Sequence, residues 1–157
     1  YEIGVRLVGS EMCIRDSDTT ETLRDRLIEA GCELLVSTLD NGLGEPTPQE
    51  GEIVWAEKII PREREIEWEL EAEKIDRLVR IGGAWTTFAG KRFKIWKAEA
   101  TSQEIKGQPG QLVGDQVATG KGSLRLIEVQ SQNRARQAFD SWKLGARLEE
   151  NCVFGDG

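Results

Sequence analysis

The sequence predicts an α+β fold that is mainly β: a small closed or partly open barrel with an inserted helix, preceded by a helical segment and a linker. Short segments of alternating polar and apolar residues follow one another over residues 84–130, separated by turn signals. Residues 71–80 have a helical period, and residues 41–53 are rich in Gly, Pro and acid. Several short strands at this spacing are typical of small barrels.

The composition predicts one domain with a real core plus an attached segment, since 38% of the 157 residues are apolar and 31% are charged. No apolar run approaches the roughly 20 residues that a bilayer span needs, so we expect no membrane contact. The three cysteines are scattered without a Cys-x-x-Cys pair. This spacing argues against a disulfide framework and a zinc or other metal site, and it indicates a reducing, cytoplasmic compartment.

Residues 1–17 show neither alternation nor a helical stripe. They resemble translated sequencing-adapter read-through, and we set them aside as a non-native artefact. A signal peptide fits poorly, because no apolar stretch of sufficient length is present.

The pattern of residues 18–40 predicts a helix. Asp18 with Glu21 predicts a capping box, Gly31 could divide the segment into two helices, and Asn41-Gly42 ends it. The apolar residues at helical spacing are Leu23, Leu27, Ala30, Leu34 and Leu35. We expect either an exposed apolar stripe or a helix folded back on the barrel. Residues 41–53 are the predicted linker.

The predicted module covers residues 54–150, followed by a tail at 151–157. A strand is expected near residues 54–58, and a helix at 71–80 that buries Ala72, Ile75, Leu78 and Val79. Further strands are expected at residues 84–88, 92–99, 111–113, 116–119 and 123–130. A last helix at 135–144 would bury Ala138, Phe139 and Trp142.

The charge is distributed unevenly along the chain, whose formal net charge is −7. Residues 1–80 hold 10 Lys and Arg against 20 Asp and Glu, whereas residues 81–147 hold 11 against 5. A basic module beside an acidic segment is expected if only the module faces phosphates, because attraction depends on the local field. Ordinary solvated strand faces are the alternative.

The strand at residues 92–99 predicts a basic ridge. Alternation sends the apolar set of Phe93, Ile95 and Trp96 inward and the cations outward. Arg125 alternates with leucines and also points outward, and Lys121 lies in a glycine turn expected beside the ridge. Such a surface suits backbone phosphates. Aromatic stacking is a second possibility, although we expect Trp85, Trp96 and Trp142 in the core.

Several separate motifs occur in an order similar to that of one family. They are Val54-Trp55-Ala56-Glu57-Lys58-Ile59, Ile66-Glu67-Trp68, Gly82-Gly83-Ala84-Trp85-Thr86-Thr87-Phe88, Gln108-Pro109-Gly110, Ala118-Thr119-Gly120-Lys121-Gly122-Ser123-Leu124 and Leu126-Ile127-Glu128-Val129-Gln130. Together they resemble the carboxy-terminal domain of methionyl-tRNA formyltransferases. The resemblance implies an OB-type barrel, with residues 18–40 as the last helix of the catalytic domain. The sequence departs from the family pattern after Gln130, where Arg134 takes the place of a family lysine.

The resemblance also implies a function. The intact family transfers a formyl group from 10-formyltetrahydrofolate to the methionine amino group on initiator methionyl-tRNA, in translation initiation. Its catalytic and folate-binding motifs are missing here, and the chain contains no histidine. We therefore expect a fragment that binds tRNA as a monomer, with no catalytic residue and no cofactor of its own, and that is inactive without the amino-terminal catalytic domain. The expected phosphate and sugar contacts are Lys91, Arg92, Lys94, Lys97, Lys121, Arg125, Arg134 and Arg136.

Two alternatives remain at this point. The chain could be the trailing domain of another folate-dependent formyltransferase or hydrolase that does not bind RNA. It could also be a structural barrel that braces the catalytic domain through the leucine stripe.

Overall fold

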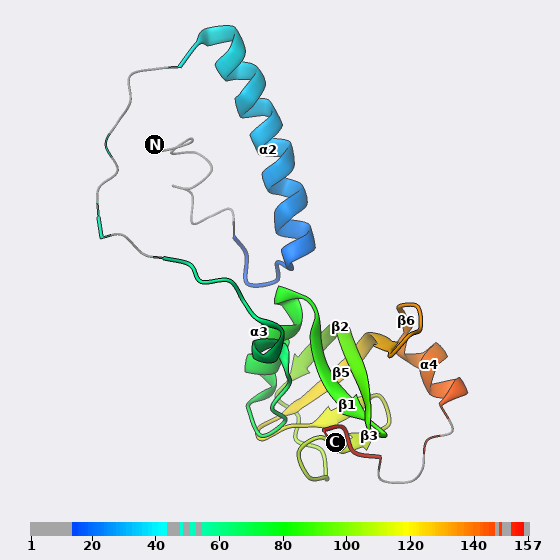
Figure 1. The fold of residues 1–157 in the computed structure, drawn as a ribbon. Coiled ribbons are helices and arrows are strands. Elements are labelled where there is room, and N and C mark those ends of the chain that lie inside the picture. The colour runs from blue at the N-terminus through cyan, green and yellow to red at the C-terminus, as the bar shows by residue number, and fades with distance from the viewer. Residues whose placement is uncertain are drawn as a thin grey trace. The chain divides into compact units, whose positions relative to one another are not determined.

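The computed structural model describes residues 14–43, 48, 51–52, 55–146, 148 and 152–155. The chain forms two compact units, Tyr1–Lys58 and Ile59–Gly157. The first contains helix α2, and the second contains every labelled strand (Figure 1). Most of the suspected artefact and much of the predicted linker lie outside the described residues. Within the described part of the chain, no helix has the length and apolar character needed to cross a bilayer.

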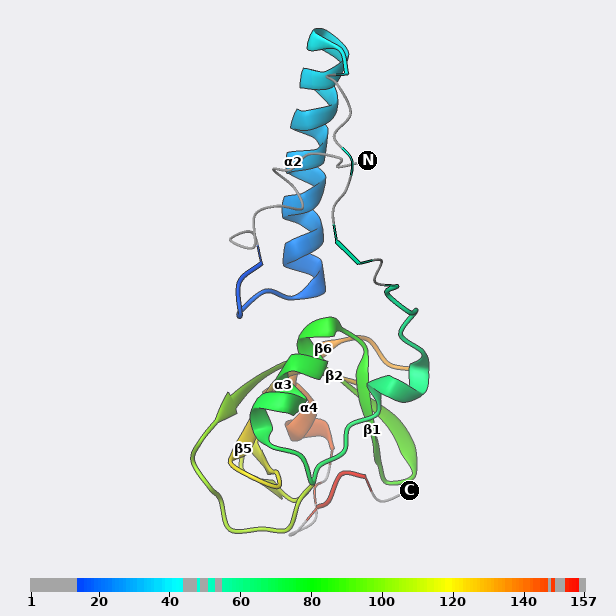
Figure 2. The ribbon, with the colours of Figure 1, turned by 90° about the vertical axis from the view of Figure 1, so that its left-hand side faces the viewer.

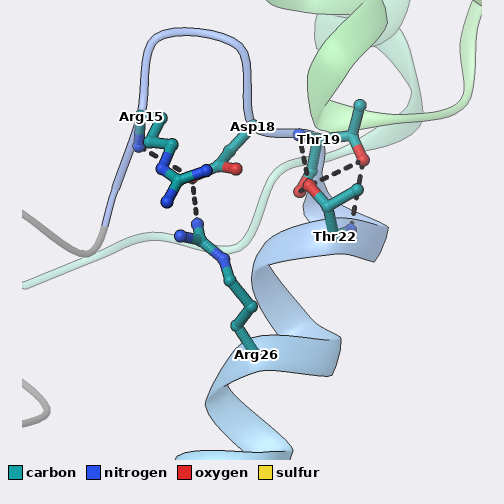
Figure 3. Close-up of polar contacts among 5 residues, drawn as sticks. All are labelled: Arg15, Asp18, Thr19, Thr22 and Arg26. Carbon is teal, nitrogen blue, oxygen red and sulfur yellow. Dashed lines mark hydrogen bonds and ion pairs between the residues drawn. The ribbon is translucent and has the colours of Figure 1, made fainter.

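Helix α2 covers Thr20–Asn41 and begins with a capping box that differs from the predicted one. Thr19 is the N-cap: its hydroxyl accepts from the Thr22 N–H at 3.2 Å, and the Thr22 hydroxyl accepts from the Thr19 N–H at 3.0 Å. Asp18 lies one residue outside the helix, where its carboxylate accepts from the Arg15 N–H at 2.7 Å and pairs with Arg26 (Figure 3). The predicted Asp18–Glu21 box is therefore wrong.

The helix runs unbroken through Gly31 and ends where predicted, with Gly42 at φ 79° as the C-cap. It buries none of its residues. Leu27 and Leu35 are 42% and 59% exposed. Leu23, Ala30 and Leu34 are half-buried, so the expected exposed apolar stripe is present only in part.

The start of the predicted module differs from the prediction. Residues 55–60 form no strand, so the described part of the strand expected at 54–58 is absent. A 3₁₀ turn, Pro61–Arg64, and helix α3, Ala72–Ile81, come first. Helix α3 buries Ala72, Ile75 and Val79 as predicted, whereas Leu78 is only half-buried. The helix precedes all the labelled strands and is not inserted among them.

One six-stranded sheet follows, with strand order β1-β2-β5-β4-β3 and β6 paired to β5. All neighbouring strands are antiparallel. The strands are β1 Ala84–Phe88, β2 Lys91–Thr101, β3 Leu112–Val113, β4 Gln116–Ala118, β5 Ser123–Ser131 and β6 Gln137–Ala138. The five strands predicted after the helix are confirmed.

The last helix is shorter than predicted. Helix α4 covers Phe139–Gly145, and residues 135–138 are not helical because Gln137–Ala138 forms β6 instead. Phe139 and Trp142 are buried, but Ala138 is exposed, so its expected burial is wrong. Helices α3 and α4 lie at opposite ends of the curved sheet (Figure 1).

The C-terminal residues bridge the two free edges of the sheet. The Leu112 N–H donates to the Cys152 carbonyl and the Phe154 N–H to the Gly110 carbonyl, both at 2.8 Å, beside β3. The Gly155 N–H donates to the Thr87 carbonyl of β1 at 2.9 Å. This short segment therefore lies between β1 and β3 (Figures 1 and 2). The result is a half-barrel with a bridged gap, and its assignment as an OB-type barrel stays a prediction.

Phe154 anchors this bridge in the core, although it belongs to the segment that the sequence set apart as a tail. Its side chain is 1% exposed. Its ring centroid lies 5.2 Å from those of Phe88 and Phe93 and 5.9 Å from that of Trp68. Nearby, the buried Trp68 indole N–H donates to the Thr86 hydroxyl at 3.0 Å. The aromatic core thus joins the beginning, middle and end of the second unit.

We predict that Phe154→Ala destabilises the second unit by about 3–5 kcal/mol, because it removes a fully buried ring and detaches the bridge. Leu144→Ala is the matched control, since Leu144 is 91% exposed on α4. Urea unfolding followed by tryptophan emission measures both changes. Equal midpoints for the two variants would contradict the proposed role of Phe154.

We also predict a depressed pKa for Asp18. The backbone N–H of Arg15 and the charge of Arg26 hold the pKa of this carboxyl below its ordinary value of 3.8. A lowered folded-state pKa means that the stabilisation of α2 is present above about pH 4 and is lost as pH falls through the folded-state value. A carbon-13 NMR titration of the carboxyl should give a midpoint below 3.8. Arg26→Gln should raise that midpoint partway, and an unchanged midpoint would contradict the ion pair.

Candidate nucleic-acid interface

Strand β2 presents the predicted cations on its outer face. Phe93 and Ile95 are buried at 1% and 0% exposure, while Lys91 and Arg92 are exposed and Lys94 is half-buried. Strict alternation therefore holds from Arg92 to Ile95, as the sequence predicted.

Trp96 continues this alternation on the outer face, and a β-bulge then turns Lys97 outward as well. Ile95 is paired with Val129 and Lys97 with Glu128. The register thus moves by two residues along β2 but by only one along β5, which defines a bulge. A second shift between Lys97 and Ala98 restores the alternation. Trp96 is half-buried on the outer face. The expectation that it lies in the core is wrong, because position 96 alternates with the buried Ile95.

Trp85 also lies on this outer face. In the β1–β2 register its Cα partner is Lys94, and its side chain is half-buried between the buried Ala84 and Thr86. Its indole N–H donates to the Pro61 carbonyl at 2.8 Å, which fixes the ring. Of the three tryptophans expected in the core, only Trp142, at 7% exposure, is buried there.

Three of the predicted cations lie over the rings of Trp85 and Trp96. The Arg92 guanidinium carbon lies 4.1 Å from the Trp85 ring centroid. The Lys94 ammonium and the Arg136 guanidinium carbon lie 5.4 Å and 5.0 Å from that of Trp96. Cation–π contacts at exposed sites contribute about 0.5–1 kcal/mol each, so the rings restrain the charged groups without neutralising them.

The turn after β5, residues 131–134, is attached to β2. The Gln132 N–H donates to the Arg92 carbonyl at 3.0 Å, and the Arg92 N–H donates to the Gln132 side-chain oxygen at 3.1 Å. Gln130 accepts from the Trp96 indole at 3.0 Å and donates to the Arg134 carbonyl at 2.7 Å. These contacts place Arg134 at the same end of the sheet as Arg92. Neither glutamine is predictable from the sequence, because no spacing rule marks them.

Two adjoining hollows lie between β2 and this turn. The larger, about 580 Å³, is lined by Lys91, Arg92 and Arg134 together with aromatic and small polar residues. The smaller, about 430 Å³, is lined by Arg92, Lys94, Gln130, Ser131, Gln132 and Asn133. No carboxylate lines either hollow among the residues that the structure describes.

Ion pairing divides the eight predicted contact residues into two groups. Arg125 pairs with Asp115 at 3.0 Å and Glu99 at 3.5 Å. Lys121 pairs with Glu71 at 3.8 Å, and Arg136 pairs with Glu128. In the described ranges, no carboxylate forms an ion pair with the other five: Lys91, Arg92, Lys94, Lys97 and Arg134. We call these five the open cluster.

Lys121 lies away from the open cluster, and the expectation that it neighbours the ridge is wrong. Its turn leads into Ser123, which faces Thr101, whereas Ser131 at the other end of β5 faces Phe93. These two pairs are eight residues apart along β2, which is a distance of roughly 25 Å at the rise per residue of a β-strand. The turn itself is built by Gly122, whose φ of 79° suits glycine. The positive field therefore concentrates at the Lys91–Arg134 end.

The fold and the site together define a small, mainly β module with a cationic, tryptophan-bearing outer face. Residues 58–147 match the family described as "Formyl transferase, C-terminal domain", and the chain belongs to this family. The resemblance on which the sequence analysis relied is therefore confirmed.

Its curated relatives include methionyl-tRNA formyltransferases. That of Streptomyces coelicolor is 35% identical over 155 residues, covering 91% of the chain and 50% of the relative. That of Nocardioides sp. is 37% identical over 157 residues, covering 90% and 49%. That of Thiobacillus denitrificans is 34% identical and covers 98% of the chain and 54% of the relative. This last alignment extends into residues 1–17, whose interpretation as an artefact stays a prediction. The chain spans about half the length of the curated relatives it matches.

Solved structures of HypX from Aquifex aeolicus share the fold. One variant superposes with a TM-score of 0.68 at 20% identity, over 88% of this chain and 27% of that chain. A second, in complex with tetrahydrofolic acid, gives a TM-score of 0.67 at 20% identity, over the same shares of the two chains. At this identity the likeness shows the fold alone.

We predict that the open cluster raises the local anion concentration around Trp85 and Trp96. Trp55→Phe is the starting protein, because Trp55 is 84% exposed and would dominate quenching. The quenching of tryptophan emission by iodide and by caesium is measured at constant ionic strength, and each value is divided by that for free tryptophan. In the starting protein this ratio should be larger for iodide than for caesium. Arg92→Gln with Lys94→Gln should remove this difference. Arg125→Gln, which changes an ion-paired arginine, should preserve it, and equal quenching by both ions in the starting protein would contradict the prediction.

Proposed function

We propose that this chain supplies the tRNA-holding portion of a methionyl-tRNA formyltransferase. The observation that carries the proposal is the open cluster: five cations along β2 and in the turn after β5, beside two outward tryptophans and without paired carboxylates among the described residues. Backbone phosphates bind such surfaces through Lys and Arg, which position the nucleic acid without reading its sequence.

Under this proposal the open cluster contacts the tRNA backbone directly. Arg136 contributes through its place over Trp96, while Lys121 and Arg125 contribute less because their charges are compensated by Glu71, Asp115 and Glu99. Exposed ion pairs of this kind are weak and exchangeable, at about 0–1 kcal/mol. They therefore reduce the field without preventing contact.

The whole protein would then transfer a formyl group from 10-formyltetrahydrofolate to methionyl-initiator-tRNA in the cytoplasm, as a monomer. The chemistry would belong to an amino-terminal catalytic domain. The residues described here would hold the tRNA and would be inactive alone. The names of the curated relatives support this reading, since they are methionyl-tRNA formyltransferases.

A second function is compatible with the same fold. A module of the same fold occurs in a protein solved with tetrahydrofolic acid whose name does not mention tRNA. The chain would in that case brace the catalytic domain of another folate-dependent formyltransferase or hydrolase, and its cations would be solvated. RNA affinity separates the two functions.

We predict that Arg92→Glu with Lys94→Glu weakens initiator-tRNA binding by about tenfold or more, because two phosphate contacts are lost and two repulsions are added. The slope of log affinity against log salt should fall by roughly two. Filter binding at several salt concentrations measures both, and urea unfolding checks that the variant folds.

Arg125→Gln is the matched control for that experiment. Arg125 is an exposed cation on β5 that already pairs with Asp115 and Glu99, so its loss should change the affinity less than about twofold. Unchanged affinity in the double variant would remove β2 from the interface. No affinity in the unaltered chain at low salt would favour the bracing function.

A further inference from the structure

We propose that the two adjoining hollows form a binding site for a single unpaired nucleotide, with the base in the larger hollow and the phosphate in the smaller one. The inference rests on the proposed function, because the nucleotide would belong to the bound RNA. It goes further in assigning a pocket where the open cluster alone would supply only a charged surface.

The larger hollow has the composition of a base site. Phe88 is half-buried, and its ring centroid lies 5.2 Å from that of Trp142 at an interplanar angle of 78°. Both residues line the hollow, and their nearly perpendicular rings give it an aromatic corner. Its volume of about 580 Å³ falls within the range of small-molecule pockets. A planar heterocycle can stack against one ring of such a corner.

Its walls carry polar groups that are free to bind a ligand. Ser131, Gln137 and Ser141 line the hollow. In the part of the chain that the structure describes, none of their side chains has a hydrogen-bond partner. Hydroxyl and amide groups both donate and accept, so they can satisfy the edge of a base.

The smaller hollow has the composition of a phosphate site. Arg92 and Lys94 line it, and so do the amide side chains of Gln132 and Asn133. The oxygen of the Gln132 amide already accepts from the Arg92 N–H, which leaves the amide's nitrogen as a donor. The smaller hollow is therefore lined by cations and amide donors, with no carboxylate among the described lining residues.

The two hollows share a border. Arg92, Ser131 and Gln132 line both of them, so a base and its own phosphate could occupy both at once. Double-helical stems keep their bases stacked and paired, whereas loops, bulges and ends present bases that can enter a pocket. The geometry therefore points to an unpaired nucleotide, and the open cluster beyond the pocket would contact the flanking phosphates.

The test uses the full chain and two RNA hairpins of equal charge, each closed by a non-nucleotide linker so that the loop presents no base. One stem is fully paired and the other carries a single-nucleotide bulge. Stacking and edge contacts to one base should favour the bulged hairpin by about tenfold in fluorescence polarisation. Ser141→Phe should abolish this preference, because a ring placed on α4 fills the larger hollow while the rim cations remain. Leu144→Phe is the matched control, since Leu144 is 91% exposed on the same helix and does not line the hollow.

Each outcome separates the inference from the function on which it rests. A preference that Ser141→Phe removes and Leu144→Phe preserves supports the nucleotide site. Equal binding of the two hairpins, with normal salt dependence, overturns the site and leaves tRNA docking intact. Binding of neither hairpin overturns both. Saturable binding of adenosine monophosphate without a preference for the bulge also overturns the inference, because the ligand of the pocket would then be a free nucleotide and not a nucleotide within RNA.

Discussion

The packing of Phe154 against the rings of Phe88, Phe93 and Trp68 holds the second unit together. The sheet has two free edges, β1 and β3, and unpaired edges expose backbone donors and acceptors. Residues 152–155 satisfy both edges at once, and their hydrogen bonds persist because Phe154 is fixed in the core. Phe88 and Phe93 in turn set the position of the β1–β2 hairpin on which the cations lie.

The outer face depends equally on the bulge at Trp96 and Lys97. Without the extra residue, Lys97 would continue the alternation of Phe93 and Ile95 and would point into the core. The bulge keeps Lys97 solvated on the face that also carries Trp96, over whose ring Lys94 and Arg136 lie. The second shift then returns Ala98 to the inner face. Two small irregularities thus add a cation to this surface without disturbing the core on either side.

Much of the fold could be predicted from the sequence because its strands are strongly patterned and separated by glycine turns. Phe93 and Ile95 alternate with cations, and Ala72, Ile75 and Val79 lie at helical spacing, so β2 and α3 were found. Capping, by contrast, depends on the backbone angles of single residues, and so Thr19 replaced Asp18 as the cap. Strand β6 was missed because two residues make too short a pattern.

The site was predicted less completely than the fold. The cations of β2 were visible as a run, but which of them are compensated depends on residues distant in sequence, such as Asp115 opposite Arg125. Trp96 was expected in the core because of its apolar ring, although it alternates with Ile95 and lies on the outer face under Lys94 and Arg136. Phe154 lies after a polar, acidic stretch that resembles a tail. For Arg125 and Phe154, a contact made in three dimensions decided the outcome.

The hydrogen bonds between Arg92 and Gln132 join positions that lie 40 residues apart. The pocket and the open cluster therefore exist only when β2 and β5 are paired, and an unfolded chain presents the same charges without the arrangement. Any anion that prefers the arranged form stabilises the folded state by mass action, by about 2.7 kcal/mol at a hundredfold excess over its Kd. RNA would thus act on this module as a ligand and as a folding partner at once, with its largest effect on the end of the sheet that carries the turn.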